Sequence, residues 1–226
     1  MSSPPNVARK LFAPIAPSYE RWAAVLSLGQ DARWRRAMID VMDLAPGATV
    51  LDLAAGTGSI TRLLEDDGHS VIALDQSLQM LSRLRARGER RILATAATLP
   101  IDDEAVDAVT FGYLLRYVND VAATMREVAR VVKPGGRVGM VEFGRPHGIW
   151  GPPWWFHTRI GLPVAGSLIG GGWREVGNFL GPSIDRFWAH QSPSGLAEIW
   201  RDAGLAAVMW RSLSLGGGLV MVGTRS

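Results

Sequence analysis

The fold of this 226-residue chain is decided by one stretch, Thr49-Val50-Leu51-Asp52-Leu53-Ala54-Ala55-Gly56-Thr57-Gly58. Its first half is an apolar run typical of a buried parallel strand. Its second half has very little side chain, and a helical pattern with Ile60, Leu63 and Leu64 on one stripe follows at once. A strand, a glycine-rich turn and a helix in this order are typical of a nucleotide-binding α/β unit, where the helix start offers free N–H donors to a ligand.

The turn favours S-adenosylmethionine over a dinucleotide. A dinucleotide site reads G-x-G-x-x-G, but Thr61 stands at the third glycine position. Asp52 lies inside the strand, where its carboxylate would repel a pyrophosphate and attract the ammonium and sulfonium groups of S-adenosylmethionine. A second apolar strand ends in Asp75, whose carboxylate suits the ribose hydroxyls. The alternative is that both acids only cap helices.

The composition indicates one globular domain without metal or disulfide chemistry. Hydrophobic residues make up 47% of the chain, which supports a large core, and a net charge of +3 is too small to indicate a nucleic-acid partner. There is no cysteine, and four scattered histidines lack the spacing of metal ligands, so we expect no metal. The sequence shows neither a signal peptide nor an apolar run long enough to span a membrane, which predicts a cytoplasmic protein.

Strands and helices alternate through the middle of the chain. We expect strands at 50–53, 71–74, 91–94, 106–111 and 138–143, with a helix directly after the glycine turn and further helices at 77–87 and 118–132. This alternation predicts an α/β fold with a doubly wound, Rossmann-like, mostly parallel seven-stranded sheet. The last two strands, 206–213 and 219–223, are too close for an intervening helix and should form an antiparallel hairpin.

Within a single domain spanning 1–226, we expect four parts. Residues 1–45 are predicted to be an N-terminal helical lid, made of a loose arm to residue 16 and helices at 17–28 and 31–42 that lie over the carboxyl ends of the strands. The cofactor-binding core spans 46–143. Residues 144–181 are rich in Gly, Pro and Trp and are predicted to be a partly helical insertion on the substrate side. Residues 182–226 carry a helix, capped by Ser192 or Ser194, and the hairpin.

From about Phe12 to Ser226 the chain resembles the class I S-adenosylmethionine-dependent methyltransferases, and more narrowly the C-methyltransferases of ubiquinone and menaquinone biosynthesis (the demethylmenaquinone methyltransferase family). Residues 50–58 match the cofactor motif of the whole superfamily, and 99–100, 107–110 and 130–137 are equally general. More specific to the quinone enzymes are Tyr19-Glu20, Leu26-Ser27-Leu28-Gly29-Gln30-Asp31, Trp34-Arg35-Arg36, Glu142-Phe143-Gly144-Arg145-Pro146 and Ser183-Ile184.

The resemblance implies S-adenosylmethionine as the cofactor and a lipophilic quinol, such as demethylmenaquinol, as the methyl acceptor. We expect cofactor contacts at Asp52, Ala54, Gly56, Thr57, Gly58, Asp75, Gln76, Thr95, Ala96 and Gly112. The chain departs from the family pattern where the substrate should lie. Residues 113–118 read Tyr-Leu-Leu-Arg-Tyr-Val, where the family has Phe-Gly-Leu-Arg-Asn-Val. Met221 replaces a histidine, and Ala23 replaces an asparagine. On the cofactor side, Thr95 replaces an aspartate.

Methyl transfer requires the protein to position the nucleophile and exclude water, because the cofactor brings the leaving group. Attack from a ring carbon also requires a phenolate-like hydroxyl on the acceptor. We expect Arg116 and Tyr19 to be the catalytic residues, and substrate contacts at Tyr113, Tyr117, Glu142, His147 and Trp154. The alternatives are that Arg116 pairs with Asp120 or Glu127, that Tyr19 is a core residue, and that His147 and His157 are surface or packing residues.

Two other functions remain open from the sequence: an O- or N-methyltransferase for another aromatic or natural-product acceptor, and a non-catalytic S-adenosylmethionine-binding partner protein. The aromatic cluster suits core packing, a substrate channel, a peripheral contact with the inner membrane face, or a homodimer face. Its members are Trp150, Trp154, Trp155, Phe156 and Trp173.

Overall fold

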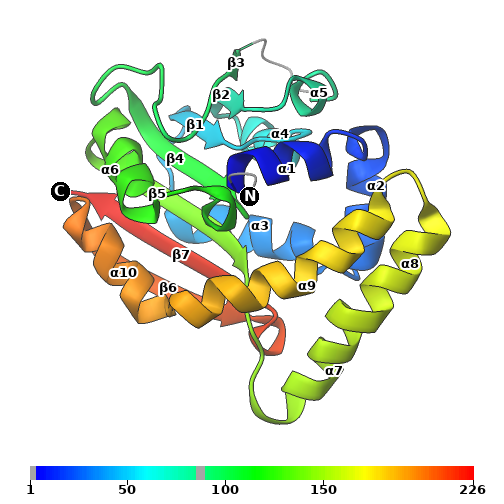
Figure 1. Ribbon diagram of the computed structural model, residues 1–226. Helices are drawn as coiled ribbons and strands as arrows, with labels where there is room; N and C mark the ends of the chain where they lie inside the picture. Colours follow the sequence, from blue (N-terminus) through cyan, green and yellow to red (C-terminus); the bar gives the residue numbers. More distant parts are fainter. Residues whose placement is uncertain (1–3, 85–89) are drawn as a thin grey trace.

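A seven-stranded sheet forms the centre of the computed structural model, which describes residues 4–84 and 90–226 (Figure 1). The strand order is β3-β2-β1-β4-β5-β7-β6. Strands β1 to β5 run parallel, and β7 is antiparallel to both β5 and β6. The predicted fold class is therefore confirmed. The bounds are β1 Thr49–Leu53, β2 Ser70–Asp75, β3 Arg91–Leu93, β4 Val106–Gly112, β5 Val132–Phe143, β6 Leu205–Leu213 and β7 Gly218–Arg225.

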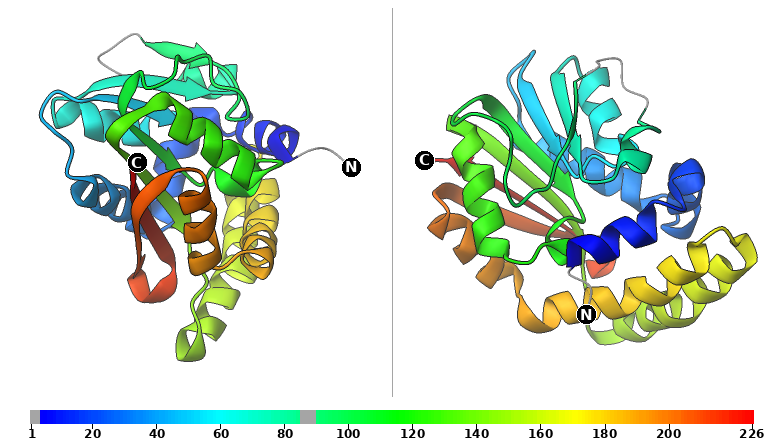
Figure 2. Two further views of the ribbon diagram at one scale, coloured as in Figure 1. Left: turned by 90° about the vertical axis from the view of Figure 1, so that its left-hand side faces the viewer. Right: turned by 45° about the horizontal axis from the view of Figure 1, so that its top comes forward.

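Both faces of the sheet are covered by helices, which explains why the central strands are apolar on both sides. Leu51 and Phe111 point to one face and pack with residues of α6 (Val121–Val131) and α10 (Pro193–Asp202). Val50 and Val141 point to the other face and pack with α3 (Gln30–Met42) and α4 (Ser59–Asp66). The two views of Figure 2 show these layers, with α1 and α9 crossing near the ends of the strands.

The N-terminal segment differs from the prediction in two ways. Residues 4–12 form a helix, α1 (Pro4–Phe12), where a loose arm was expected, followed by the short turn η1 (Ala16–Ser18) and α2 (Tyr19–Leu26). Helix α3 is not part of a lid, since it packs against β5 and β7 on the face of the sheet. Glycines in the strands allow this close approach: a Cβ on Gly139 would lie 2.3 Å from Met42 Sδ.

The segment after β5 is more helical than predicted. It contains η3 (Gly148–Trp150), α7 (Gly151–Phe156), a π-helical turn (η4, His157–Gly161), α8 (Leu162–Ile169) and α9 (Trp173–His190). Helix α9 runs through Pro182 and across the predicted boundary at residue 181. Ser192 caps α10, since its Oγ accepts a hydrogen bond from the Gly195 N–H.

Two helices of the core are shorter than predicted. Helix α5 (Leu78–Leu81) ends well before residue 87, and residues 85–87 of that prediction lie outside the described residues. Helix α6 begins at Val121, after the turn η2 (Leu115–Tyr117), and leads directly into β5 at Val132. The turn η2 thereby holds Arg116 at the carboxyl end of β4, where the functional cavities lie.

Candidate active site

Two adjoining cavities lie at the carboxyl ends of β1, β2 and β4. The smaller, about 210 Å³, is bordered by the glycine turn, β2, the loop after β3 and helix α1. The larger, about 300 Å³, lies between α2, α9, the α7–α8 segment and the loop after β6, and its lining is mostly apolar. Phe12, Tyr19 and Tyr113 line both cavities. A molecule in one cavity is therefore separated from a molecule in the other by no more than these side chains.

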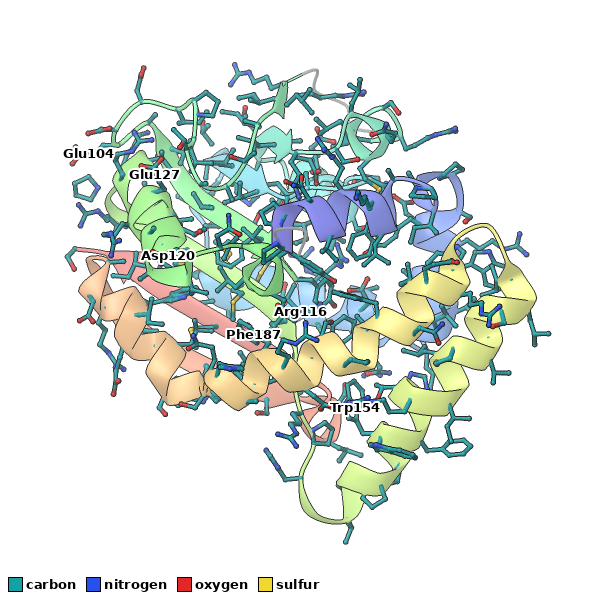
Figure 3. The ribbon with its side chains drawn as sticks, in the orientation of Figure 1. Glu104, Arg116, Asp120, Glu127, Trp154 and Phe187 are labelled. Atoms are coloured by element: carbon teal, nitrogen blue, oxygen red, sulfur yellow. The ribbon has the colours of Figure 1, made fainter. Side chains whose placement is uncertain are left out.

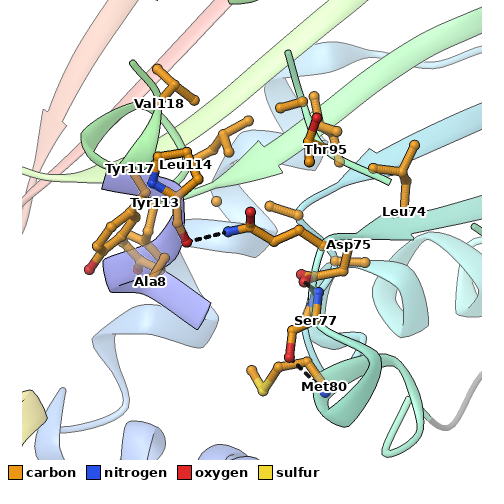
Figure 4. Close-up of a pocket in the computed structure, with 18 of the residues that line it drawn as sticks. Ala8, Leu74, Asp75, Ser77, Met80, Thr95, Tyr113, Leu114, Tyr117 and Val118 are labelled. Carbon is orange, nitrogen blue, oxygen red and sulfur yellow. Dashed lines mark hydrogen bonds between the residues drawn. The ribbon is translucent and has the colours of Figure 1, made fainter. Parts of the chain in front are cut away.

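The glycine turn bends sharply beneath the smaller cavity. Ala54, Gly56 and Gly58 all have positive φ angles, of 58°, 60° and 87°. Asp75 stabilises the turn, because its Oδ2 accepts a hydrogen bond from the Gly56 N–H at 2.9 Å and its Oδ1 accepts one from the Ser77 N–H at 2.8 Å. Burial raises the pKa of the Asp75 carboxyl, while these N–H donors oppose the rise. The carboxylate is thus held in one orientation at the cavity wall (Figure 4).

The structure corrects the expectation that the Asp52 carboxylate faces the ligand. Asp52 is fully buried, and its carboxylate accepts hydrogen bonds from Thr61 Oγ1 at 2.6 Å and Thr110 Oγ1 at 3.3 Å. Burial raises its pKa to about 6, although Thr61 and the Arg35 charge oppose the rise. The Asp52 carboxylate therefore lies beneath the turn and links β1 to α4 and β4 through these two hydrogen bonds. Thr57 and Gly58 are likewise absent from the cavity lining formed by the described residues, and Thr57 Oγ1 is buried without a partner there.

The other residues expected at the cofactor do line the smaller cavity. They are Ala54, Gly56, Asp75, Gln76, Thr95, Ala96 and Gly112. The sequence reasoning missed helix α1, which adds Pro5, Ala8, Arg9 and Phe12 to the wall. Gln76 Nε2 donates a hydrogen bond to the Pro5 carbonyl at 3.1 Å, so this predicted residue also anchors α1. The amphipathic pattern of residues 4–12 was the signal that could have found α1.

A cluster of polar residues lies where the two cavities meet. Asp31 Oδ1 accepts hydrogen bonds from Arg35 Nε at 2.9 Å and from the Tyr113 hydroxyl at 2.5 Å. The Arg35 guanidinium lies 5.4 Å from the centre of the Tyr113 ring, and Tyr19 stacks on Trp173. Burial raises the pKa of both tyrosine hydroxyls, so Tyr19 and Tyr113 are neutral hydrogen-bonding groups at neutral pH.

Arg116 forms a buried ion pair with Glu142, at an Nε–Oε1 distance of 2.9 Å, and its Nη1 donates a hydrogen bond to Ser183 Oγ at 2.8 Å. The alternative partners are excluded, since Asp120 caps α6 and Glu127 pairs with Arg130; Figure 3 shows both away from Arg116. Arg116 lines the larger cavity.

Glu142 is a correction to the predicted substrate contacts. It is fully buried, it lines neither cavity, and its Oε2 has no hydrogen-bond partner within residues 4–84 and 90–226. Burial raises the pKa of its carboxyl, and the Arg116 charge opposes this. Glu142 therefore holds the Arg116 guanidinium in place without lining either cavity.

The remaining predicted substrate contacts divide between different places. Tyr113 and Trp154 line the larger cavity, as expected of groups near an acceptor. Tyr117 lines the smaller cavity instead, where its ring stacks on Phe179. His147 is exposed on the loop after β5 and lines only a surface groove, so the structure does not bring it to either of the adjoining cavities. His157 lines the larger cavity, and partial burial lowers its pKa.

The model of the ubiE/COQ5 methyltransferase family matches residues 3–225. The chain belongs to this family. Among named relatives, a demethylmenaquinone methyltransferase from Mycolicibacterium gilvum is 37% identical over 96% of this chain and 92% of its own length. One from Renibacterium salmoninarum is also 37% identical, over 96% of this chain and 90% of its own length. The predicted class of enzyme, a methyltransferase, is thereby confirmed.

Solved structures show that this ubiE/COQ5-family methyltransferase has a widely used fold. A possible histamine N-methyltransferase from Thermotoga maritima aligns with a TM-score of 0.67 and 18% identity, covering 96% of this chain and 99% of that chain. A geranyl diphosphate C-methyltransferase from Streptomyces coelicolor, solved with S-adenosyl-L-homocysteine, aligns with a TM-score of 0.60 and 16% identity, covering 87% and 79%. At these identities the likeness supports the fold alone.

Proposed function

We propose that this protein transfers a methyl group from S-adenosylmethionine to a ring carbon of a lipophilic quinol, with demethylmenaquinol as the first acceptor to test. The observation that carries the proposal is the pair of adjoining cavities. The smaller borders the glycine turn and Asp75, and the larger is mostly apolar. The names of the relatives support this acceptor class.

The residues of the smaller cavity suit S-adenosylmethionine, which supplies an electrophilic methyl group when bound. We assign Asp75 to the ribose hydroxyls, because two backbone N–H groups already orient its carboxylate. The turn at Ala54–Gly56 offers backbone groups to the amino-acid part of the cofactor, and Thr95 with Ala96 borders the adenine. Gly112 lines the same cavity and lets the Ile60 and Val141 side chains pack close to β4, since a Cβ there would lie 3.3 Å from each.

Three of the predicted cofactor residues act indirectly in this proposal. Asp52 supplies negative charge beneath the turn and ties it to Thr61 and Thr110. Thr57 and Gly58 shape the turn, since a Cβ at Gly58 would lie 2.9 Å from Leu84 Cγ. Gln76 holds α1 over the cavity through Pro5.

The larger cavity would hold the ring of the acceptor against Tyr19 and Tyr113. Arg116 would stabilise the phenolate by its fixed positive charge. It cannot act as the base, because a guanidinium keeps its proton at neutral pH. Transfer to a ring carbon releases one proton overall: the hydroxyl loses a proton before attack, the ring carbon loses one after it, and the oxygen of the product regains one. Asp31 and His157 line the cavity and are groups that can accept them. Trp154 adds apolar wall for the ring or tail.

The direct test is a methyl-transfer assay with labelled S-adenosylmethionine and reduced demethylmenaquinol in detergent. We expect a product with one additional methyl on a ring carbon, identified by fragmentation in mass spectrometry, and none from an Asp75→Ala variant. A methyl on oxygen or nitrogen of another aromatic acceptor, with none on the quinol, would instead support the O- or N-methyltransferase alternative. Cofactor binding without transfer to any acceptor would support the non-catalytic alternative.

A further inference from the structure

An apolar stripe runs along the outer side of the α7–α8 segment. Phe156, Ile160, Val164 and Leu168 recur every four residues and are 58%, 40%, 55% and 84% exposed. Residues at this spacing lie on one side of a helix. Figures 1 and 2 show α7 and α8 projecting away from the sheet, with α9 behind them. The stripe is therefore a continuous apolar ridge on the surface of the molecule.

The opposite side of the same segment is packed tightly onto α9. Gly166 and Gly177 let the two helices touch: a Cβ on Gly166 would lie 2.3 Å from the Trp173 carbonyl oxygen, and one on Gly177 would lie 2.5 Å from the Leu162 carbonyl oxygen. Thr158 and Leu162 are buried in this contact. Because α9 holds the inner side, the stripe cannot turn inward to join the core.

The charged side chains of residues 144–174, which include the stripe, are all positively charged. From residue 144 to residue 174 the sequence contains no Asp or Glu, while Arg145, Arg159 and Arg174 are exposed. Arg145 and Arg159 share Asp185 of α9, and exposed Glu175 follows Arg174, so the three arginines leave this face with a small net positive charge. A symmetric contact between two copies of this face would bring like charges together. An anionic surface is the complementary partner.

The larger cavity also has exposed apolar residues in its lining. Leu28, Trp150 and Leu215 line that cavity and are also 77%, 45% and 63% exposed. Leu28 and Leu215 lie at the tips of two turns, each with a positive φ angle. The larger cavity therefore presents apolar side chains to its surroundings, as the stripe does.

We propose that the α7–α8 stripe docks on the surface of a lipid bilayer that carries anionic headgroups. Trp and Phe side chains suit the interface between headgroups and acyl chains, and the arginines suit the headgroups. No helix within the described part of the chain is long and apolar enough to cross a bilayer, so the contact is peripheral. Resting on the proposed function, this docking would let the tail of the acceptor enter the cavity directly from lipid.

Vesicle flotation of the full-length protein tests this proposal. The vesicles contain phosphatidylcholine alone or an equimolar mixture with phosphatidylglycerol. The test variant carries Phe156→Gln and Leu168→Gln, two exposed positions that line neither cavity. The matched control carries Leu78→Gln and Leu93→Gln, which are 62% and 57% exposed on α5 and β3. We expect the wild type and the control to float with the mixed vesicles and the test variant to bind at least about tenfold more weakly.

Two controls keep the result interpretable. Thermal melting shows whether the test variant is folded. If it is not, a variant that carries Ile160→Gln and Val164→Gln takes its place. Transfer to a short-tailed, water-soluble quinol should be unchanged in the test variant; if even the wild type lacks this activity, the proposed function fails while the docking result stands. Equal binding of test and control variants, or no flotation of the wild type, overturns the docking proposal. So does a wild-type dimer in vesicle-free ultracentrifugation that the test variant abolishes, because a second copy would then cover the stripe.

Discussion

Replacing Asp52 with asparagine should change the pH dependence of stability in a defined direction. Burial raises the pKa of Asp52 from 3.8 to about 6. Between these values the folded state retains a proton that the unfolded state has lost, so the free energy of unfolding of the wild type falls as the pH rises. The difference of about two pKa units corresponds to about 3 kcal/mol. Asparagine does not ionise, and its carbonyl still accepts a hydrogen bond from Thr61 or Thr110.

The measurement is urea unfolding of the wild type and Asp52→Asn from pH 4 to pH 7, without added cofactor. The free energy of unfolding of the variant, minus that of the wild type, should increase by about 2 kcal/mol across this range, which covers most of the full difference. For a chain of this size that is about 4–8 °C in melting temperature. Asp67→Asn is the matched control: the Arg36 ion pair lowers the pKa of Asp67 from 3.8, so both states are ionised above pH 4 and its difference should stay nearly constant across this range. A difference for Asp52→Asn that stays constant with pH would refute the reasoning.

Three further predictions concern the site and its support. Arg116→Ala should lower the free energy of unfolding by about 3–5 kcal/mol, because Glu142 remains buried without its partner. Arg116→Lys should retain part of that stability but lose about 100-fold in the rate of methyl transfer. A wild-type transfer rate in either variant would remove Arg116 from the mechanism. Gly177→Val should cost about 1–3 kcal/mol in thermal unfolding, since even a Cβ would lie 2.5 Å from the Leu162 carbonyl oxygen, and an unchanged melting temperature would contradict the close packing of α8 on α9. Asp75→Ala should weaken the stabilisation by S-adenosylmethionine, which for the wild type should reach about 2.7 kcal/mol at 100 times the dissociation constant; equal thermal shifts in both proteins would argue against the ribose assignment.

The core of the fold could be predicted because its signals are local. Runs such as 138–141 are apolar at consecutive positions, and only a strand covered on both faces buries every one of them. Helix α1 was missed because nine residues form a stable helix only through packing. That packing is supplied by residues distant in the sequence, as in the contact of Phe12 with Tyr117.

The same distinction applies to the candidate site. The family pattern indicates Arg116 as a catalytic residue, and the sequence offers Asp120 or Glu127 as partners only in the alternative interpretation. Its actual partner, Glu142, comes from β5, and Ser183 comes from α9. The two histidines after β5 were equivalent in the sequence, yet a helix turns His157 toward the larger cavity while His147 remains on an exposed loop.

The sequence by itself determined the α/β fold, the glycine turn after β1, the antiparallel end of the sheet and the methyltransferase family, because each depends on residues adjacent in the chain. Only the tertiary structure decided that Asp52 points away from the cofactor cavity, that α3 packs on the sheet while its first turns line the cavities, and that α7 and α8 expose an apolar stripe. These features depend on which distant elements pack together, and no local pattern of side chains specifies that packing.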